Sequence, residues 1–89
     1  MIVKFKGKFR RDLIKIQDKS LNKAVRTTIE NVKRANHISQ IDRLVKLKDY
    51  KIHFRIEIPG NYRIGLIIKK DTVWFSRVLH RNTIYKKFP

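Results

Sequence analysis

Cysteine is absent from this sequence, and proline, glycine and methionine are scarce. Without cysteine, the chain can form neither a disulfide framework nor a thiolate metal site. No stretch approaches the ~18 apolar residues of a membrane-spanning helix. The first lysine, Lys4, follows Met1 too closely for a signal peptide. These absences predict a cytoplasmic protein.

Acidic residues are also few. The 89 residues include 7 Asp and Glu against 23 Lys and Arg, which gives a formal net charge of +16. Such a charge destabilises the compact state by self-repulsion and is usually tolerated because a partner neutralises it. The hydrophobic fraction of 42% is that of a folded domain. We therefore predict one folded domain, residues 1–89, that binds a polyanion, with RNA favoured over a membrane surface or a merely solubilising charge.

Hydrophobic periodicity predicts an α+β fold with the order β-α-α-β-β-β, in which two helices pack on one face of a small, mainly antiparallel sheet. Segment 37–47 is ambiguous and is expected to touch the core, as a helical turn in one reading. The expected elements are a strand over 2–6, a helix over 8–17, a helix from an N-cap at Ser20 to about Asn36, strands over 50–58, 62–69 and 72–79, and a basic tail over 80–89.

Strand register predicts which side chains share a face. A three-residue turn over 59–61 would pair Glu57 with Arg63 and Arg55 with Gly65, leaving open space for a ligand beside Gly65. A two-residue turn at 70–71 would pair Gly65 with Ser76 and Arg63 with Val78. This second register also turns Arg77 towards Ile64 on the helix side, where it must reach solvent or a carboxylate, and puts His80 on the open face.

The open face is expected to be cationic. Alternating charge on a strand usually marks only a solvated face. A merely solvated face, however, would mix charges of both signs, whereas this one carries Lys51, His53, Arg55 and Arg63 against Glu57 alone. The composition therefore favours a binding site for a polyanion.

Three segments also resemble a known family. They are Leu47–Ile56, Gly60–Ile64 with its Gly-x-Tyr-Arg element, and His80–Tyr85 with its His-Arg-x-x-x-Tyr ending. In this order and spacing, the chain resembles the RelE/ParE toxin superfamily of bacterial type II toxin–antitoxin modules over nearly its whole length. The resemblance implies a RelE-like fold, an acidic antitoxin partner, and one of two activities: mRNA cleavage in the ribosomal A site, as in RelE-like members, or inhibition of DNA gyrase, as in ParE-like members.

RelE-like enzymes share ionisable residues on one strand, an Arg after the hairpin, a later Arg and a Tyr near the C-terminus. His53 stands where the best-known members carry a second Lys. The resemblance thereby implies the catalytic candidates Lys51, His53, Arg63, His80, Arg81 and Tyr85, and we add the RNA-binding candidates Arg55, Lys48, Lys86 and Lys87.

The implied chemistry is attack of a 2′-hydroxyl on its own 3′-phosphate, which needs no cofactor. Lys51 and His53 are both candidates for the base, because His titrates near neutrality and the charged form of a Lys among Arg side chains is disfavoured. Arg63 suits the phosphorane charge, Arg81 and His80 the stabiliser and acid, and Tyr85 a stacked base. We predict no metal site, because the spacing of the three His matches no metal pattern. A non-enzymatic gyrase inhibitor or RNA-binding module is the alternative.

Overall fold

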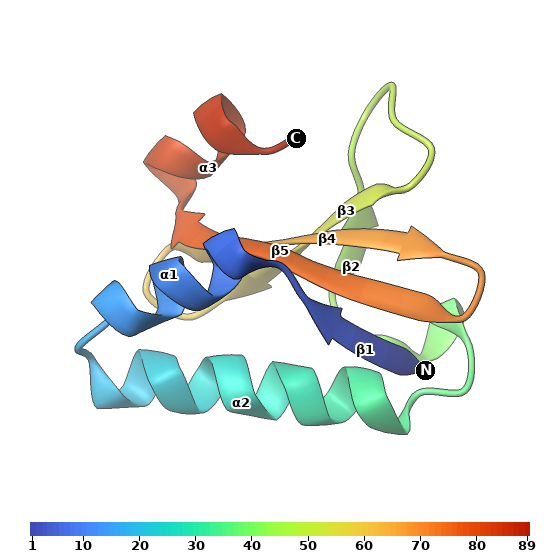
Figure 1. Ribbon diagram of the computed structural model, residues 1–89, viewed down its shortest axis with the longest axis horizontal. Helices are drawn as coiled ribbons and strands as arrows, with labels where there is room; N and C mark the ends of the chain where they lie inside the picture. Colours follow the sequence, from blue (N-terminus) through green and yellow to red (C-terminus); the bar gives the residue numbers. More distant parts are fainter.

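The computed structural model of the protein describes all 89 residues and contains one five-stranded sheet in the order β1-β5-β4-β3-β2. β1 pairs with β5 in parallel, and the other neighbours are antiparallel. The α+β fold class is confirmed (Figure 1). The elements are β1 (Ile2–Phe5), α1 (Gly7–Lys15), α2 (Lys19–Arg34), a 3₁₀ turn η1 (Ile38–Gln40), β2 (Leu44–Lys46), β3 (His53–Ile58), β4 (Tyr62–Lys69), β5 (Thr72–His80) and α3 (Arg81–Lys87).

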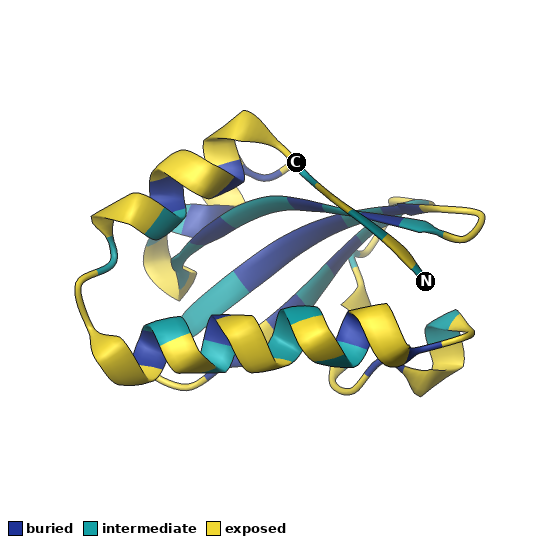
Figure 2. Ribbon diagram, turned by 60° about the horizontal axis from the view of Figure 1, so that its bottom comes forward, coloured by how far each residue is buried: buried dark blue, intermediate teal, exposed yellow.

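One sheet face and the two N-terminal helices enclose the core. The apolar stripes predicted for α1 and α2 supply Phe9, Val25 and Val32, which are all at most 1% exposed. Figure 2 shows α2 with its buried segments turned towards the sheet. Neither helix is long and apolar enough to cross a membrane, and α3 is shorter still. The sheet contributes Phe54, Ile56, Ile58, Ile64, Leu66, Ile68, Val73, Phe75 and Val78 to the same core.

The start of α2 differs from the expected one. Asp18, not Ser20, is the N-cap, because its carboxylate accepts a hydrogen bond from the backbone N–H of Leu21 at 3.0 Å. The Ser20 hydroxyl also donates to Asp18 at 2.7 Å. These hydrogen bonds, that from Ser20 first, hold the pKa of Asp18 below its usual value. The helix ends at Arg34, slightly before the expected Asn36.

The region before β3 also departs from the prediction. A helical turn was one reading of segment 37–47, and the structure has this turn at η1 but adds the short strand β2. β3 begins at His53 instead of Tyr50, because the chain makes a turn first. In that turn the Tyr50 N–H donates to the Leu47 carbonyl at 3.2 Å, and Asp49 has a positive φ of 69°. Lys51 consequently lies in a loop and not on the strand.

The predicted register is confirmed for β3 and β4, where Glu57 pairs with Arg63 and Arg55 pairs with Gly65. It is wrong for the second half of β5. An irregularity at Gly65/Leu66 leaves Ser76 without a partner, so Gly65 pairs with Arg77. Beyond this bulge Arg63 pairs with Leu79, Ile64 with Val78 and Tyr62 with His80.

Arg77 does find the carboxylate that its expected position required. Its Nε and Nη2 donate to the two oxygens of Asp12, on α1, at 2.8 and 2.9 Å. The side chains of Arg77 and Asp12 are only 12% and 6% exposed. This bidentate pair ties α1 to β5 at the edge of the sheet that β1 leaves uncovered.

Candidate nucleic-acid interface

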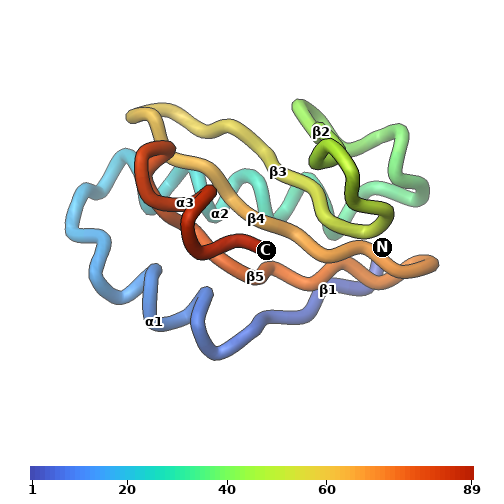
Figure 3. Tube along the Cα trace, turned by 90° about the horizontal axis from the view of Figure 1, so that it is seen from above, coloured from blue at the N-terminus to red at the C-terminus, as the bar shows by residue number.

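The sheet face that turns away from the core is called the open face here. It carries the side chains that alternate with the core residues along β3 and β4, including His53, Arg55, Glu57 and Arg63. Figure 3 looks onto this face and shows α3 lying across β4 and β5 at one end. The face is therefore only partly open, since the segment predicted as a basic tail is a helix that folds back onto it.

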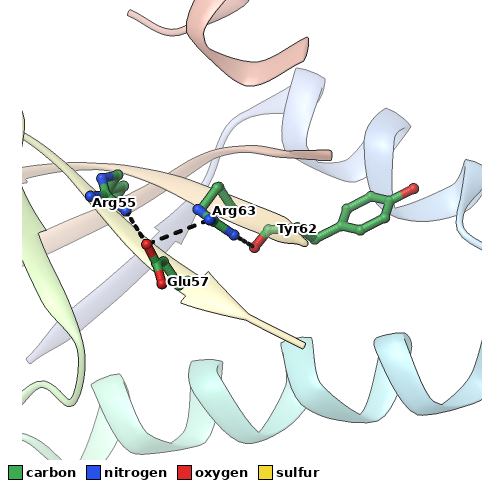
Figure 4. Close-up of polar contacts among 4 residues, drawn as sticks. All are labelled: Arg55, Glu57, Tyr62 and Arg63. Atoms are coloured by element: carbon green, nitrogen blue, oxygen red, sulfur yellow. Dashed lines mark hydrogen bonds and ion pairs between the residues drawn. The ribbon is translucent and has the colours of Figure 1, made fainter. Parts of the chain in front are cut away.

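Two arginines share one carboxylate at the α3 end of the open face (Figure 4). Arg55 Nη1 donates to Glu57 Oε1 at 2.7 Å, and Arg63 Nη2 lies 3.5 Å from the same oxygen. The hydrogen bond from Arg55, and then the charge of Arg63, hold the pKa of Glu57 below its usual value. The cluster keeps a net charge of about +1, because one carboxylate cannot neutralise two guanidinium groups.

Arg63 is held firmly but is not fully bonded. Its side chain is 13% exposed, its Nη1 donates to the Tyr62 carbonyl at 3.1 Å, and its Nε is buried without a partner. A guanidinium has five N–H donors in a planar fork that matches the oxygens of a phosphate. Arg63 is thus a fixed, largely buried cation with one unpaired donor, Nε, that solvent does not reach.

Gly65 does not provide the open space that the sequence suggested. A Cβ at this position would lie 2.7 to 2.8 Å from the ring of Phe88, so the ring rests directly on the glycine backbone. Phe88 is 4% exposed and Ile84 of α3 is 1% exposed. The C-terminal segment buries these two residues against the middle of the open face. The prediction of open space for a ligand beside Arg55 and Gly65 was therefore wrong, because the Phe88 ring fills that space.

His53 and Lys51 lie on the far side of Phe88. The His53 ring centroid is 5.2 Å from that of Tyr50 and 5.6 Å from that of Phe88, and Nδ1 is buried without a partner. His53 pairs with Ile67, which is four residues along β4 from Arg63, or about 13 Å. The structure therefore does not bring His53 and Arg63 to one point, and Lys51 is exposed in its loop.

His80, like Lys51, does not lie where the sequence predicted it. Because the bulge shifts the register, His80 pairs with Tyr62 on the core side, with ring centroids 5.6 Å apart. Its Nδ1 accepts a hydrogen bond from the Asn82 N–H at 3.2 Å, so it caps α3. The residue that the sequence assigned to the open face instead begins the helix that covers it.

The remaining candidates are on the surface of α3 and in the loop before β3. The Arg81 N–H donates to the Asn61 carbonyl at 2.8 Å, which fixes the start of α3 beside the β3–β4 turn. Arg81 and Tyr85 are both exposed and lie one helical turn apart, so they share one side of α3. Lys86 and Lys87 follow in the last turn, and Lys48 is exposed in the loop.

Phe88 is a residue that the sequence-based reasoning missed. The only sequence pattern that could have predicted its burial is the spacing of four residues between Ile84 and Phe88, which places both on one side of a helix. The structure contains no group of three His, Cys, Asp or Glu residues that could hold a metal ion. A groove lies between α2 and the end of β3, and Lys23, Thr27, Arg43 and Glu57 are among the residues that line it.

A sheet with a parallel first strand, two helices over one face and a cationic opposite face defines the RelE-like class of small α+β domains. Residues 3–85 match the family described as ParE toxin of the type II toxin–antitoxin system, parDE. The chain belongs to the RelE/ParE toxin superfamily, and is a toxin of a type II toxin–antitoxin system.

Known relatives support the same assignment. Toxin RelE3 of Methanocaldococcus jannaschii is 39% identical over 70 residues, which cover 78% of each chain. The RelB–RelE antitoxin–toxin complex from Methanococcus jannaschii superposes with a TM-score of 0.80 at 35% identity, over 97% of this chain and 99% of that chain. The intact E. coli RelBE complex matches with a TM-score of 0.69 at 15% identity, over 89% and 94%, which shows a shared fold alone.

Proposed function

We propose that this toxin is a ribosome-dependent endoribonuclease that cleaves mRNA in the A site without a metal ion. The observation that carries the proposal is the Arg55–Glu57–Arg63 cluster on the sheet face, in which one carboxylate leaves a net positive charge and the largely buried Arg63 keeps an unpaired Nε. Such a group can hold a phosphate and stabilise the charge that develops on the phosphorane. A cytoplasmic location, where ribosomes are found, is part of the proposal.

The roles of the other residues follow from where they lie. Lys51 and His53 remain the candidates for the base that takes the 2′-hydroxyl proton. Arg81 is the candidate for stabilising the leaving 5′-oxygen, which takes its proton from water, because His80 is engaged as the cap of α3. Tyr85 is 55% exposed and can stack on a nucleobase. Phe88 lies between His53 and Arg63, so RNA that contacts both residues must displace it. We propose that Phe88 and α3 move off the sheet when the toxin binds the ribosome.

An acidic antitoxin protein is the second proposed partner. The two complexes from Methanococcus jannaschii and E. coli each hold a RelE toxin with a RelB antitoxin. The charge of +16 supports an acidic partner for this chain, because binding would relieve its self-repulsion. A segment that orders on binding can cover a large surface of this kind.

The decisive experiment compares Arg63→Ala with Arg26→Ala. Arg26 is an exposed arginine of α2 with no ion pair, so both variants lose one charge. Loss of one stabilising donor is expected to reduce cleavage by roughly 10²–10³-fold, as for oxyanion-hole donors. Cleavage is mapped by primer extension on translated mRNA, and circular dichroism verifies that each variant is folded. Tyr85→Ala is expected to impair cleavage as well.

Full cleavage activity in Arg63→Ala and Tyr85→Ala would contradict the nuclease mechanism. A second candidate function is inhibition of DNA gyrase, which the match to the ParE toxin family and the separation of His53 from Arg63 favour. Expression of the toxin under tight control separates the two. Gyrase-dependent DNA breaks with intact mRNA would show that the toxin inhibits gyrase and does not cleave mRNA. Growth restored by a co-expressed acidic protein would support the proposed antitoxin partner in either case.

A further inference from the structure

A second set of basic and aromatic side chains lies on the open face, away from the arginine cluster. Lys4 of β1 pairs with Trp74 of β5, Trp74 with Ile67, and Ile67 with His53, so these residues form one row across four strands. Trp74 stands between Val73 and Phe75, which are both fully buried in the core. Because side chains alternate along a strand, Trp74 must point to the open face.

Two lysines lie over the Trp74 ring. Lys6 Nζ is 4.4 Å and Lys4 Nζ is 5.3 Å from the ring centroid. Neither lysine forms an ion pair, since the four ion pairs of the protein involve other residues. Two ammonium groups therefore meet at one aromatic ring without a carboxylate to neutralise them, so the positive charge at this ring is free to attract an anion.

This part of the face is not covered by α3. In Figure 3, α3 lies across the end of β5 that leads into it, whereas β1 and the start of β5 have no helix over them. Phe88 reaches His53, at the other end of the row, but forms no ring contact with Trp74. The site around Trp74 is thus accessible even when α3 occupies the middle of the sheet.

We propose that Trp74, Lys4 and Lys6 form a binding site for single-stranded RNA, in which the two lysines move off the indole face to hold the flanking phosphates and a base stacks on the ring in their place. Proteins that bind single strands commonly combine aromatic stacking with a cationic track along the backbone. Lys4 and Lys6 are alternate residues of an extended segment, about 7 Å apart, so they follow the strand direction. The inference rests on the proposed function and extends its RNA contact beyond the cleaved phosphate.

A purely structural role makes a different prediction. Lysines on an edge strand deter pairing with other chains, and a cation over an exposed indole stabilises a fold slightly without any ligand. In that case RNA would bind elsewhere on this basic protein, and the environment of Trp74 would not change. Since Trp74 is the only tryptophan of the chain, its fluorescence reports on this site alone.

The test titrates the folded wild-type protein with a short 2′-O-methyl oligouridylate, which cannot be cleaved because its 2′-oxygen is blocked. Saturable quenching of the Trp74 emission is expected, and heparin, a polyanion without bases, is expected to bind without stacking on the indole. Fluorescence anisotropy of a labelled oligonucleotide then gives affinities. Trp74→Leu is expected to weaken binding by about 5- to 100-fold, the range of one lost stacking contact.

The lysines are tested by the salt dependence of binding. Lys4→Ala with Lys6→Ala is expected to reduce the slope of log K against log salt by about 1.4 units, because each lost phosphate contact contributes about 0.7. The matched control is Lys15→Ala with Lys19→Ala, which removes two exposed, unpaired lysines near the α1–α2 connection. The control is expected to lower affinity less and to leave Trp74 quenching intact.

Two results would overturn the proposal. One is RNA binding with unchanged Trp74 emission and equal slopes for the two double variants. The other is quenching by polyglutamate but not by the oligonucleotide, which would assign the site to an acidic protein segment. Neither result depends on cleavage of mRNA, so the nuclease proposal stands or fails separately by the Arg63→Ala experiment.

Discussion

Two arginines flank Gly65 in one row of the sheet, Arg55 on β3 and Arg77 on β5, and their surroundings differ. Arg77 has Asp12 to itself, in a bidentate pair in which the carboxylate also accepts the Val78 N–H at 3.1 Å. The hydrogen bond with Asp12 raises the pKa of Arg77 above its already high value. Arg55 instead shares Glu57 with Arg63, and Glu57 is 52% exposed.

The difference distinguishes a structural arginine from one that is available for binding. Both oxygens of Asp12 are occupied, so the pair has little left to offer a ligand and serves to join α1 to β5. The Glu57 cluster is neutralised only in part, and its Glu57 and Arg55 side chains are 52% and 25% exposed, although Arg63 is as buried as Arg77. Changes at the two carboxylates should therefore affect different properties: Asp12 the stability of the fold, and Glu57 the affinity for anions.

The largest effect is expected for Asp12→Ala. Removing one partner of a buried ion pair leaves Arg77 charged and unpaired, and such changes typically destabilise a protein by about 3–5 kcal/mol. The free energy of unfolding is measured by urea denaturation. Glu30→Ala is the control, because Glu30 and Lys33 form an exposed pair at 3.6 Å, whose loss should change stability by no more than about 0.5 kcal/mol. Equal losses of stability in the two variants would show that the buried Asp12–Arg77 pair stabilises the fold no more than the exposed Glu30–Lys33 pair.

A smaller effect is expected for Gly65→Ala, between the two arginines. The new methyl group would meet the Phe88 ring at 2.7 Å, and overpacking of this kind typically costs about 1–3 kcal/mol. Because the ring sits on the chain terminus, we expect α3 to detach and become more sensitive to proteolysis. In a Phe88→Ala background the same substitution should change stability little, and strictly additive losses would show that the contact is not what restricts position 65.

The smallest effect on stability is expected for Glu57→Gln, which should instead strengthen RNA binding by releasing Arg55 and Arg63. The pKa of Glu57 is lowered in the folded protein, so the carboxylate stabilises the fold above its ordinary pKa of 4.5 and this contribution is lost as the pH falls through the lowered pKa. Melting temperatures of wild type and variant should therefore differ at neutral pH and converge in acid. A constant difference across this range would exclude the ion pairs as its source.

The sequence predicted the pairing of β3 with β4, although not the start of β3, because apolar and ionisable residues alternate strictly from Ile52 to Ile58 and the turn at 59–61 fixes their register. It thereby predicted the contact between Glu57 and Arg63. The bulge at Ser76 does leave a mark in the hydrophobic pattern, because strict alternation after Phe75 puts Arg77 on the core side and Val78 on the open face, whereas the structure buries Val78. The misplaced Arg77 was explained by a carboxylate partner and not by a bulge. For that reason the position of His80 was wrong.

The C-terminal helix was missed for a related reason. Its seven residues contain one buried side chain, Ile84, and its amphipathic pattern is completed only by Phe88 beyond its end. A helix this short is stable only through its contacts with the sheet. The sequence therefore supplied the cationic side chains of the candidate site but not the aromatic ring that separates them.

The parallel pairing of β1 with β5 has a consequence for the synthesis of the toxin. The pairs from Ile2 with Thr72 to Phe5 with Phe75 each join positions 70 residues apart. A ribosome makes β1 well before β5, so β1 has no strand to pair with until the residues up to Phe75 have emerged. Contacts of such long range form late, after the local hairpins of β3, β4 and β5. A chain whose translation stops before Thr72 should thus be both unfolded and harmless, and the toxin can fold only after β5 has been translated.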